Sequence, residues 1–155
     1  MKTIVITSWY FNPIHPGHIE CLEMCKELGD ELRVIVNNDE QVKIKTGKEE
    51  VFQDQNFRAK IVSSLKSVDR IIFSIEDSSY SNQTSLFQPI VDSIIYVVDL
   101  IRQKYWTDTK IIFGKGWDRW STNTPEADIC KKLWVEIIYW LWAKTHNSST
   151  YRAKS

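Results

Sequence analysis

Residues 3–28 read TIVITSWYFNPIHPGHIECLEMCKEL, and this stretch carries the pattern that decides the fold. It opens with a short apolar run rich in β-branched residues, which is typical of a strand covered on both faces. A Pro-containing loop follows, and apolar residues then recur at helical spacing over residues 21–28 until Gly29 ends the predicted helix. The stretch predicts a strand, a loop and a helix in direct succession.

The same alternation continues along the chain. Further apolar, strand-like runs occupy residues 32–36, 71–73, 111–113 and 135–139. Strands that alternate with helices through right-handed crossovers form an open parallel sheet. The sequence therefore predicts an α/β fold: a Rossmann-like, open, parallel five-stranded sheet with helices on both faces, in a single domain over residues 1–155. Ligands of such sheets bind at the carboxyl ends of the strands.

Apolar residues recur at helical spacing in the segments between the predicted strands. One contains Phe57, Ile61, Leu65 and Val68. A longer one runs from Ile90 to Ile101, with Pro89 suited to its first turn, and a short helix is expected after Thr124-Pro125-Glu126. The cysteines are expected to pack in the core: Cys21, Cys25 and Cys130. The tryptophans around the last strand are expected in the core or at a subunit interface: Trp134, Trp140 and Trp142.

Length and charge exclude several classes of protein. The 155 residues suit one domain, and 20 basic residues balance 20 acidic ones, so no bulk positive field favours nucleic acid or an anionic membrane. No apolar run is as long as a membrane span. Three cysteines make no disulfide framework, and we therefore expect a reduced, cytoplasmic setting.

The first loop places two histidines, His15 and His18, where a helix begins. The first-turn N–H groups and the helix dipole attract anions there, and Gly17 permits close approach of a phosphate to the backbone. Two other interpretations remain open. The histidines could be surface residues of a turn, or they could bind zinc together with a third ligand such as His146, the chain's only other histidine.

Residues 12–18, Asn-Pro-Ile-His-Pro-Gly-His, resemble the HxGH signature of the nucleotidyltransferase superfamily. That superfamily includes glycerol-3-phosphate cytidylyltransferase, heptose-phosphate adenylyltransferase and nicotinate-nucleotide adenylyltransferase. Further segments follow in the superfamily's order over nearly the whole chain: residues 28–32, 34–39, 58–62, 68–69, 115–118 and 148–150.

The resemblance implies transfer of a nucleoside monophosphate from ATP or CTP to a phosphorylated sugar or polyol, with Mg²⁺, release of pyrophosphate and often a homodimer. It implies catalytic roles for His15, His18 and Lys45. It implies contacts with the nucleotide by Tyr10, Phe11, Asn12, Gly17, Lys115, Gly116, Asp118, Ser148, Ser149, Thr150 and Arg152. It implies contacts with the phosphorylated acceptor by Asn37, Asp39 and Arg58.

Several of these residues have alternative roles. Lys43 and Lys48 compete with Lys45 in a segment that we expect to be a flexible polar loop. Asp39 could instead cap a helix or turn, and Arg58 could make a structural ion pair. Residues 148–150 could cap a C-terminal helix as well as contact a triphosphate.

The chain departs from the superfamily pattern at three places. Trp9 and Trp117 stand where glycine is usual, so two indoles could narrow the pocket. Ala153 stands where a basic residue is usual, between Arg152 and Lys154. A catalytically impaired nucleotide-binding protein of the same fold is therefore the alternative function.

Overall fold

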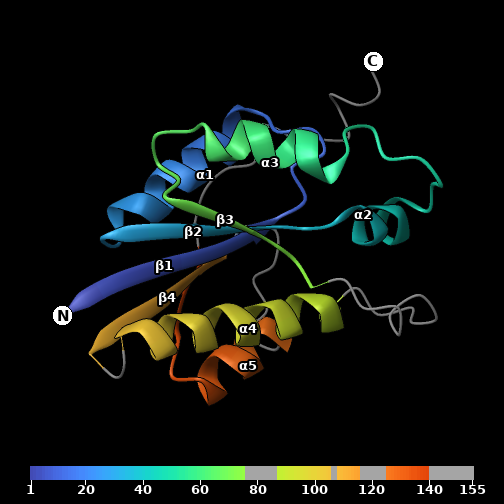
Figure 1. Cartoon of the computed structure of the whole chain (residues 1–155). Coiled ribbons are helices and arrows are strands. Elements are labelled where there is room, and N and C mark those ends of the chain that lie inside the picture. The colour runs from blue at the N-terminus through green and yellow to red at the C-terminus, as the bar shows by residue number, and fades with distance from the viewer. Residues whose placement is uncertain (76–86, 106–107, 116–124, 140–155) are drawn as a thin grey trace.

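The computed structural model describes residues 1–75, 87–105, 108–115 and 125–139. All five predicted strands are present: β1 (Lys2–Trp9), β2 (Glu31–Val36), β3 (Arg70–Phe73), β4 (Thr109–Lys115) and β5 (Glu136–Tyr139). They pair in parallel in the order β3-β2-β1-β4-β5, which confirms the open parallel sheet (Figure 1). Because β1 is central, its carboxyl end lies between those of β2 and β4.

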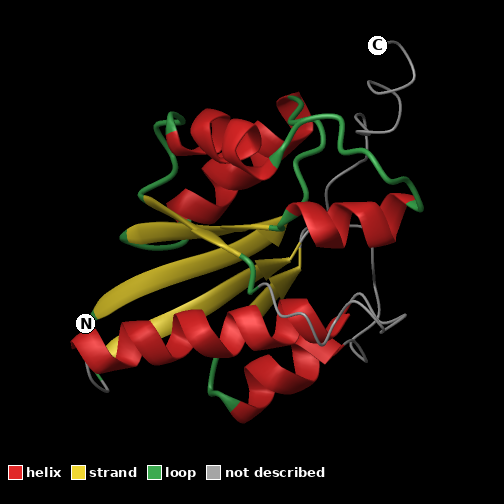
Figure 2. Cartoon of the chain, turned by 45° about the vertical axis from the view of Figure 1, so that its right-hand side comes forward, coloured by secondary structure: helices red, strands yellow, loops and turns green. Residues whose placement is uncertain are grey.

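Helices cover both faces of the sheet, as predicted. Helices α1 (Pro16–Glu27) and α3 (Gln55–Ser63) lie on one face, and α4 (Phe87–Tyr105) and α5 (Pro125–Lys132) lie on the other (Figure 1). Helix α2 (Asp39–Thr46) lies beyond the carboxyl end of β2, off the sheet (Figure 2). None of the described helices is long and apolar enough to cross a membrane.

Two hydrophobic clusters flank the sheet because successive strand residues point to opposite faces. In β1, Ile4 and Ile6 pack beneath α4, whereas Val5 between them packs beneath α1. Cys21 and Cys25 of α1 belong to the second cluster and Cys130 of α5 to the first, so all three cysteines are buried and free, as expected for core residues.

Gly29 brings the chain from α1 back to the sheet. The helix ends at Glu27, with Leu28 as its cap, and Asp30 then donates its backbone N–H to the carbonyl oxygen of Thr3 at 2.8 Å. A Cβ atom at position 29 would lie 2.8 Å from that same oxygen and 2.9 Å from Val5 Cγ2. The glycine is therefore required by the close approach of two backbones.

Two sequence-based expectations were wrong, and a third was narrowed. Residues 39–46 are a helix instead of a flexible loop, because Asn38 caps it by accepting from the Gln41 N–H and Gly47 ends it in the left-handed conformation. Phe57 is 53% exposed, because α3 turns Arg58, Ala59 and Val62 inward. Trp134 is 89% exposed, which excludes the core and leaves a subunit interface as the other expectation for this side chain.

Candidate active site

The two histidines of the first loop lie together at the start of α1. His15 is the N-cap residue, and its Nδ1 accepts a hydrogen bond from the Gly17 N–H at 3.1 Å. His18 is the third helical residue, and its Nδ1 accepts from the His15 N–H at 3.2 Å. The rings stack with their centroids 3.8 Å apart, and both side chains are buried. This reciprocal capping box fixes both imidazoles against the helix terminus.

The capping bonds determine where each neutral ring carries its proton. A nitrogen that accepts a hydrogen bond must keep its lone pair, so Nδ1 of His15 and of His18 is unprotonated. The proton of each neutral imidazole is then on Nε2. The pair therefore presents two Nε2–H donors at the positive end of the α1 dipole, an arrangement suited to phosphate oxygens.

Burial keeps His18 neutral. Its imidazole meets the edges of two aromatic rings, Trp9 at 5.2 Å and Phe11 at 5.1 Å between centroids. Loss of solvation is the main cause and the neighbouring His15 and Lys45 add to it, so that the pKa of His18 is lowered from 6.5 to about 3. At neutral pH, His18 is thus a hydrogen-bond donor without a charge.

Protonation of His18 should destabilise the fold as the pH falls. Because the pKa is about 3 in the folded protein and 6.5 in the unfolded chain, the stabilisation is complete above pH 6.5 and is lost progressively toward pH 3. Between about pH 7.5 and about pH 4.5, the free energy of unfolding should fall by about 2 to 3 kcal/mol more in the wild type than in His18→Asn. Urea unfolding of both proteins measures the difference, and equal losses would contradict a buried neutral imidazole.

Lys45 is the lysine that α2 brings to the histidines. Its Nζ lies 4.0 Å above the centre of the Tyr10 ring, a cation–π contact with the first loop. Its positive charge also lowers the pKa of His18. Lys43, by contrast, pairs with Glu40 on its own helix at 3.1 Å. Of the three lysines in this region, the geometry therefore favours Lys45 as the one that serves the site.

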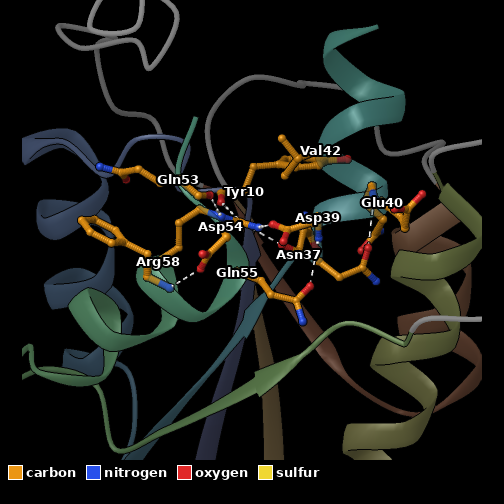
Figure 3. A network of polar contacts seen from close by, with 12 residues as sticks. Tyr10, Asn37, Asp39, Glu40, Val42, Gln53, Asp54, Gln55 and Arg58 are labelled. Atoms are coloured by element: carbon orange, nitrogen blue, oxygen red, sulfur yellow. Dashed lines mark hydrogen bonds and ion pairs between the residues drawn. The ribbon is translucent and has the colours of Figure 1, made fainter. Parts of the chain in front are cut away.

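Arg58 joins the elements that carry the site (Figure 3). Its guanidinium donates to three backbone carbonyl oxygens, those of Tyr10 at 2.6 Å, Asn37 at 2.7 Å and Gln53 at 2.9 Å. It also pairs with Asp39 Oδ1 at 2.8 Å. The side chain has no exposed surface, and burial lowers its pKa although Asp39 opposes that effect. The structural ion pair is therefore the role that the structure shows for Arg58, and its contact with an acceptor stays a prediction.

The other residues predicted to hold the acceptor lie at the end of β2. Asn37 is buried, and its Oδ1 accepts from the Ser8 hydroxyl at 3.2 Å, which links the ends of β1 and β2. Asp39 is the first residue of α2, and the cap is its neighbour Asn38. The capping alternative for Asp39 is therefore wrong, and its ion pair with Arg58 is its observed role.

Lys115 comes to the same edge of the sheet from the end of β4. Its Nζ makes a buried ion pair with Glu126 Oε2 of α5 at 2.6 Å, and both side chains are about one-tenth exposed. Sequence reasoning did not identify Glu126 as a partner because the two residues belong to different elements. The lysine is held by this carboxylate at the place where the nucleotide contact is predicted.

The first loop, the α1 terminus, Lys45 and Lys115 thus meet around the carboxyl end of the central strand, and this geometry can be compared with known proteins. The family profile described as Cytidylyltransferase-like matches residues 10–153. The chain belongs to this family. The matched segment begins in the loop that carries the two histidines.

Two kinds of curated protein are similar in sequence to this chain. Bifunctional protein HldE of Actinobacillus pleuropneumoniae is 41% identical over 77 residues, which are 50% of this chain and 16% of that protein. FAD synthase of Methanocorpusculum labreanum is 37% identical over 111 residues, 72% of this chain and 71% of the relative. The chain thus spans about a sixth of the HldE protein and nearly three-quarters of the FAD synthase.

A solved structure from Thermoplasma volcanium extends the similarity to nearly the full chain. It is the crystal structure of a lipopolysaccharide core biosynthesis protein, with a TM-score of 0.63 and 27% sequence identity. The alignment covers 90% of this chain and 96% of that one. The Rossmann-like fold and the cytidylyltransferase-like family are therefore supported by both sequence and structure.

Part of the predicted cytidylyltransferase-like site lies outside the described residues: Gly116, Trp117, Asp118, Ser148, Ser149, Thr150 and Arg152. His146, the third ligand of the zinc alternative, lies there too. Within the described ranges, no group of three His, Cys, Asp or Glu side chains is arranged to hold a metal ion.

Proposed function

We propose that this chain transfers a nucleoside monophosphate from ATP or CTP to a phosphorylated sugar or polyol and releases pyrophosphate. The observation that carries the proposal is the capped histidine pair, which presents two neutral Nε2–H donors at the positive end of α1. Membership of the cytidylyltransferase-like family supports the same class of reaction. The names of the relatives leave the acceptor open, since one of them is an FAD synthase.

The proposed reaction needs no protein nucleophile. An oxygen of the acceptor's phosphate forms a bond to the α-phosphorus, and the bond from that phosphorus to the pyrophosphate oxygen breaks, so the electron pair leaves with pyrophosphate. Negative charge on the transferred phosphoryl group is stabilised by donors already in place. His15 and His18 would supply hydrogen bonds, and Lys45 would supply a positive charge.

Magnesium enters the proposal bound to the triphosphate. Mg²⁺ usually keeps several waters and binds proteins through one or two carboxylates together with substrate phosphates. Binding through the substrate phosphates fits this site, because its described residues offer cationic and N–H groups and no set of three carboxylates that could hold the ion alone. When bound, the ion would neutralise charge on the leaving pyrophosphate, while the chain's residues orient the reacting groups.

Pyrophosphate release tests the proposal directly. The purified chain is incubated with Mg²⁺, one of the four ribonucleoside triphosphates and one acceptor from a panel of sugar phosphates, polyol phosphates, flavin mononucleotide and nicotinate mononucleotide. Release that depends on both a triphosphate and a sugar or polyol phosphate supports the proposal. Release only with flavin or nicotinate mononucleotide keeps the reaction class and replaces the acceptor. Thermal stabilisation by a triphosphate without release would favour the nucleotide-binding alternative.

Lys45→Ala should lower kcat/KM by roughly ten- to a hundredfold, because one cation that serves the phosphates is removed. Lys43→Ala is the matched control. It removes the same side chain two positions away on α2, where the ammonium pairs with Glu40 instead of contacting the first loop. Pyrophosphate release is measured for both variants. A larger loss of kcat/KM in Lys43→Ala than in Lys45→Ala would show that Lys43 contacts the phosphates instead.

We also propose a homodimer in a reducing, cytoplasmic setting. Three free cysteines, all of them buried, support the reducing setting. Light scattering coupled to size-exclusion chromatography of the full chain measures the oligomeric state, and a monomer at micromolar concentration would exclude the dimer.

A further inference from the structure

The environment of His18 has a feature that capping does not explain. Three rings surround the imidazole: His15 stacks on it at 3.8 Å, and the edges of Trp9 and Phe11 face it at 5.2 and 5.1 Å. His15 is a neighbour along the helix and Phe11 is part of the loop. Trp9 comes from a different element, since it is the last residue of β1.

The backbone of Trp9 is firmly held in the sheet. It pairs with Val36 of β2, and its carbonyl oxygen accepts from the Asn37 N–H at 3.1 Å. The indole packs against the cluster that includes Phe11 and Leu22. The backbone of this residue is therefore positioned by the strand, and its ring by the cluster against which it packs.

Stability alone does not favour an indole at this position. The Nε1 atom of Trp9 is buried and has no hydrogen-bond partner in the described part of the chain. An unpaired buried N–H group destabilises a fold, whereas a phenyl ring would pack without one. The wide indole does, however, cover more of the neighbouring imidazole than a smaller side chain would.

We propose that Trp9 is a positioning residue for His18: its ring excludes water from one side of the imidazole and so keeps that ring neutral, with the proton on Nε2. This inference rests on the proposed function, in which His18 donates to a phosphate oxygen. A protonated ring would carry a proton on Nδ1 as well and would lose the bond from the His15 N–H. Shielding by Trp9 thus preserves both the donor and the helix cap.

The charged groups around His18 do not depend on Trp9. His15 on α1 and Lys45 on α2 are the titratable neighbours that act on its charge, and both lower its pKa. Phe11 of the first loop and Trp9 of β1 carry no charge. A substitution of Trp9 therefore changes the solvation of His18 while leaving its charged neighbours in place.

The test is NMR titration of the histidine side chains in the wild type, Trp9→Phe, Trp9→Leu and Trp9→Ala, with His18 assigned through His18→Asn. In the wild type, the His18 ring should stay neutral, with its proton on Nε2, down to about pH 4.5. In Trp9→Phe, whose smaller ring covers less of the imidazole, the pKa of His18 should rise slightly. In Trp9→Ala, its pKa should rise by about 1 or more toward 6.5. Trp9→Leu keeps a larger side chain at the site, so the pKa of His18 should be intermediate. This variant replaces Trp9→Ala in the test if the alanine variant does not fold. An unchanged titration in both small-residue variants would overturn the inference.

Pyrophosphate release separates this inference from the proposed function. If His18 acts as inferred, the pH at which kcat falls by half on the acid side should rise in Trp9→Ala together with the pKa of His18. A shift of the NMR titration in a protein that releases no pyrophosphate with any acceptor would leave the positioning role intact and refute the reaction. If kcat of Trp9→Ala kept the wild-type dependence on acid pH although the pKa of His18 had risen, activity would not need the shielding of His18. That result would overturn the functional part of the inference.

Discussion

Replacing Arg58 by methionine should lower the free energy of unfolding by about 3 to 5 kcal/mol, the largest loss of stability expected from a single substitution in this chain. The guanidinium is fully buried and donates to the carbonyl oxygens of Tyr10, Asn37 and Gln53 and to the carboxylate of Asp39. Methionine fills a similar volume but donates nothing. Three carbonyl groups, all buried or partly buried, and a carboxylate would then lose their partner at once.

Urea unfolding of Arg58→Met beside Lys60→Met measures this loss. Lys60 lies two residues further along α3 and is exposed, so its substitution should change stability by no more than about 0.5 kcal/mol. Arg58→Lys should fall between the two, because one ammonium cannot reproduce a planar fork that serves four acceptors. If Arg58→Met unfolded at the same urea concentration as Lys60→Met, the network in Figure 3 would contribute no stability.

Replacing either His15 or His18 by asparagine should lower kcat roughly a hundredfold or more, the largest effect on activity that we expect. Asparagine places an oxygen near the position of Nδ1, so it can still accept the capping bond from Gly17 or from the His15 N–H. It does not reach the position of Nε2. The substitution therefore removes the proposed donor to the phosphate and keeps the helix cap.

Alanine variants of the same residues separate the two roles. His15→Ala and His18→Ala remove donor and cap together, so each should also lose about 1 kcal/mol of stability that the asparagine variants retain. Pyrophosphate release and urea unfolding are measured on all four proteins. Near-wild-type turnover in His18→Asn would refute the role assigned to Nε2. Release of stoichiometric zinc from the wild type and not from the variants would instead support the metal interpretation.

Strand and helix patterns in the sequence were sufficient to predict the architecture. Short β-branched runs such as residues 3–6 and 32–36 alternate with helical stripes, and this local signal is strong because both faces of a parallel sheet are buried. The open parallel sheet was confirmed, whereas the order of its strands, β3-β2-β1-β4-β5, came from the structure. Helix α2 could also have been predicted, since Asn38 followed by Gln41 three residues later is a capping pattern.

The sequence by itself determined that His15 and His18 stand at a helix N-terminus in the loop after the central strand, because the Pro-Gly spacing and the apolar stripe that follows are local signals. Only the tertiary structure decided what surrounds them. Lys45 lies over the Tyr10 ring, and Arg58 donates to the carbonyl oxygen of Tyr10, which is 48 residues away in the sequence. The burial of Arg58 shows that it holds the elements of the site together. The fold alone sets that burial, because solvation depends on neighbours that are distant in the chain.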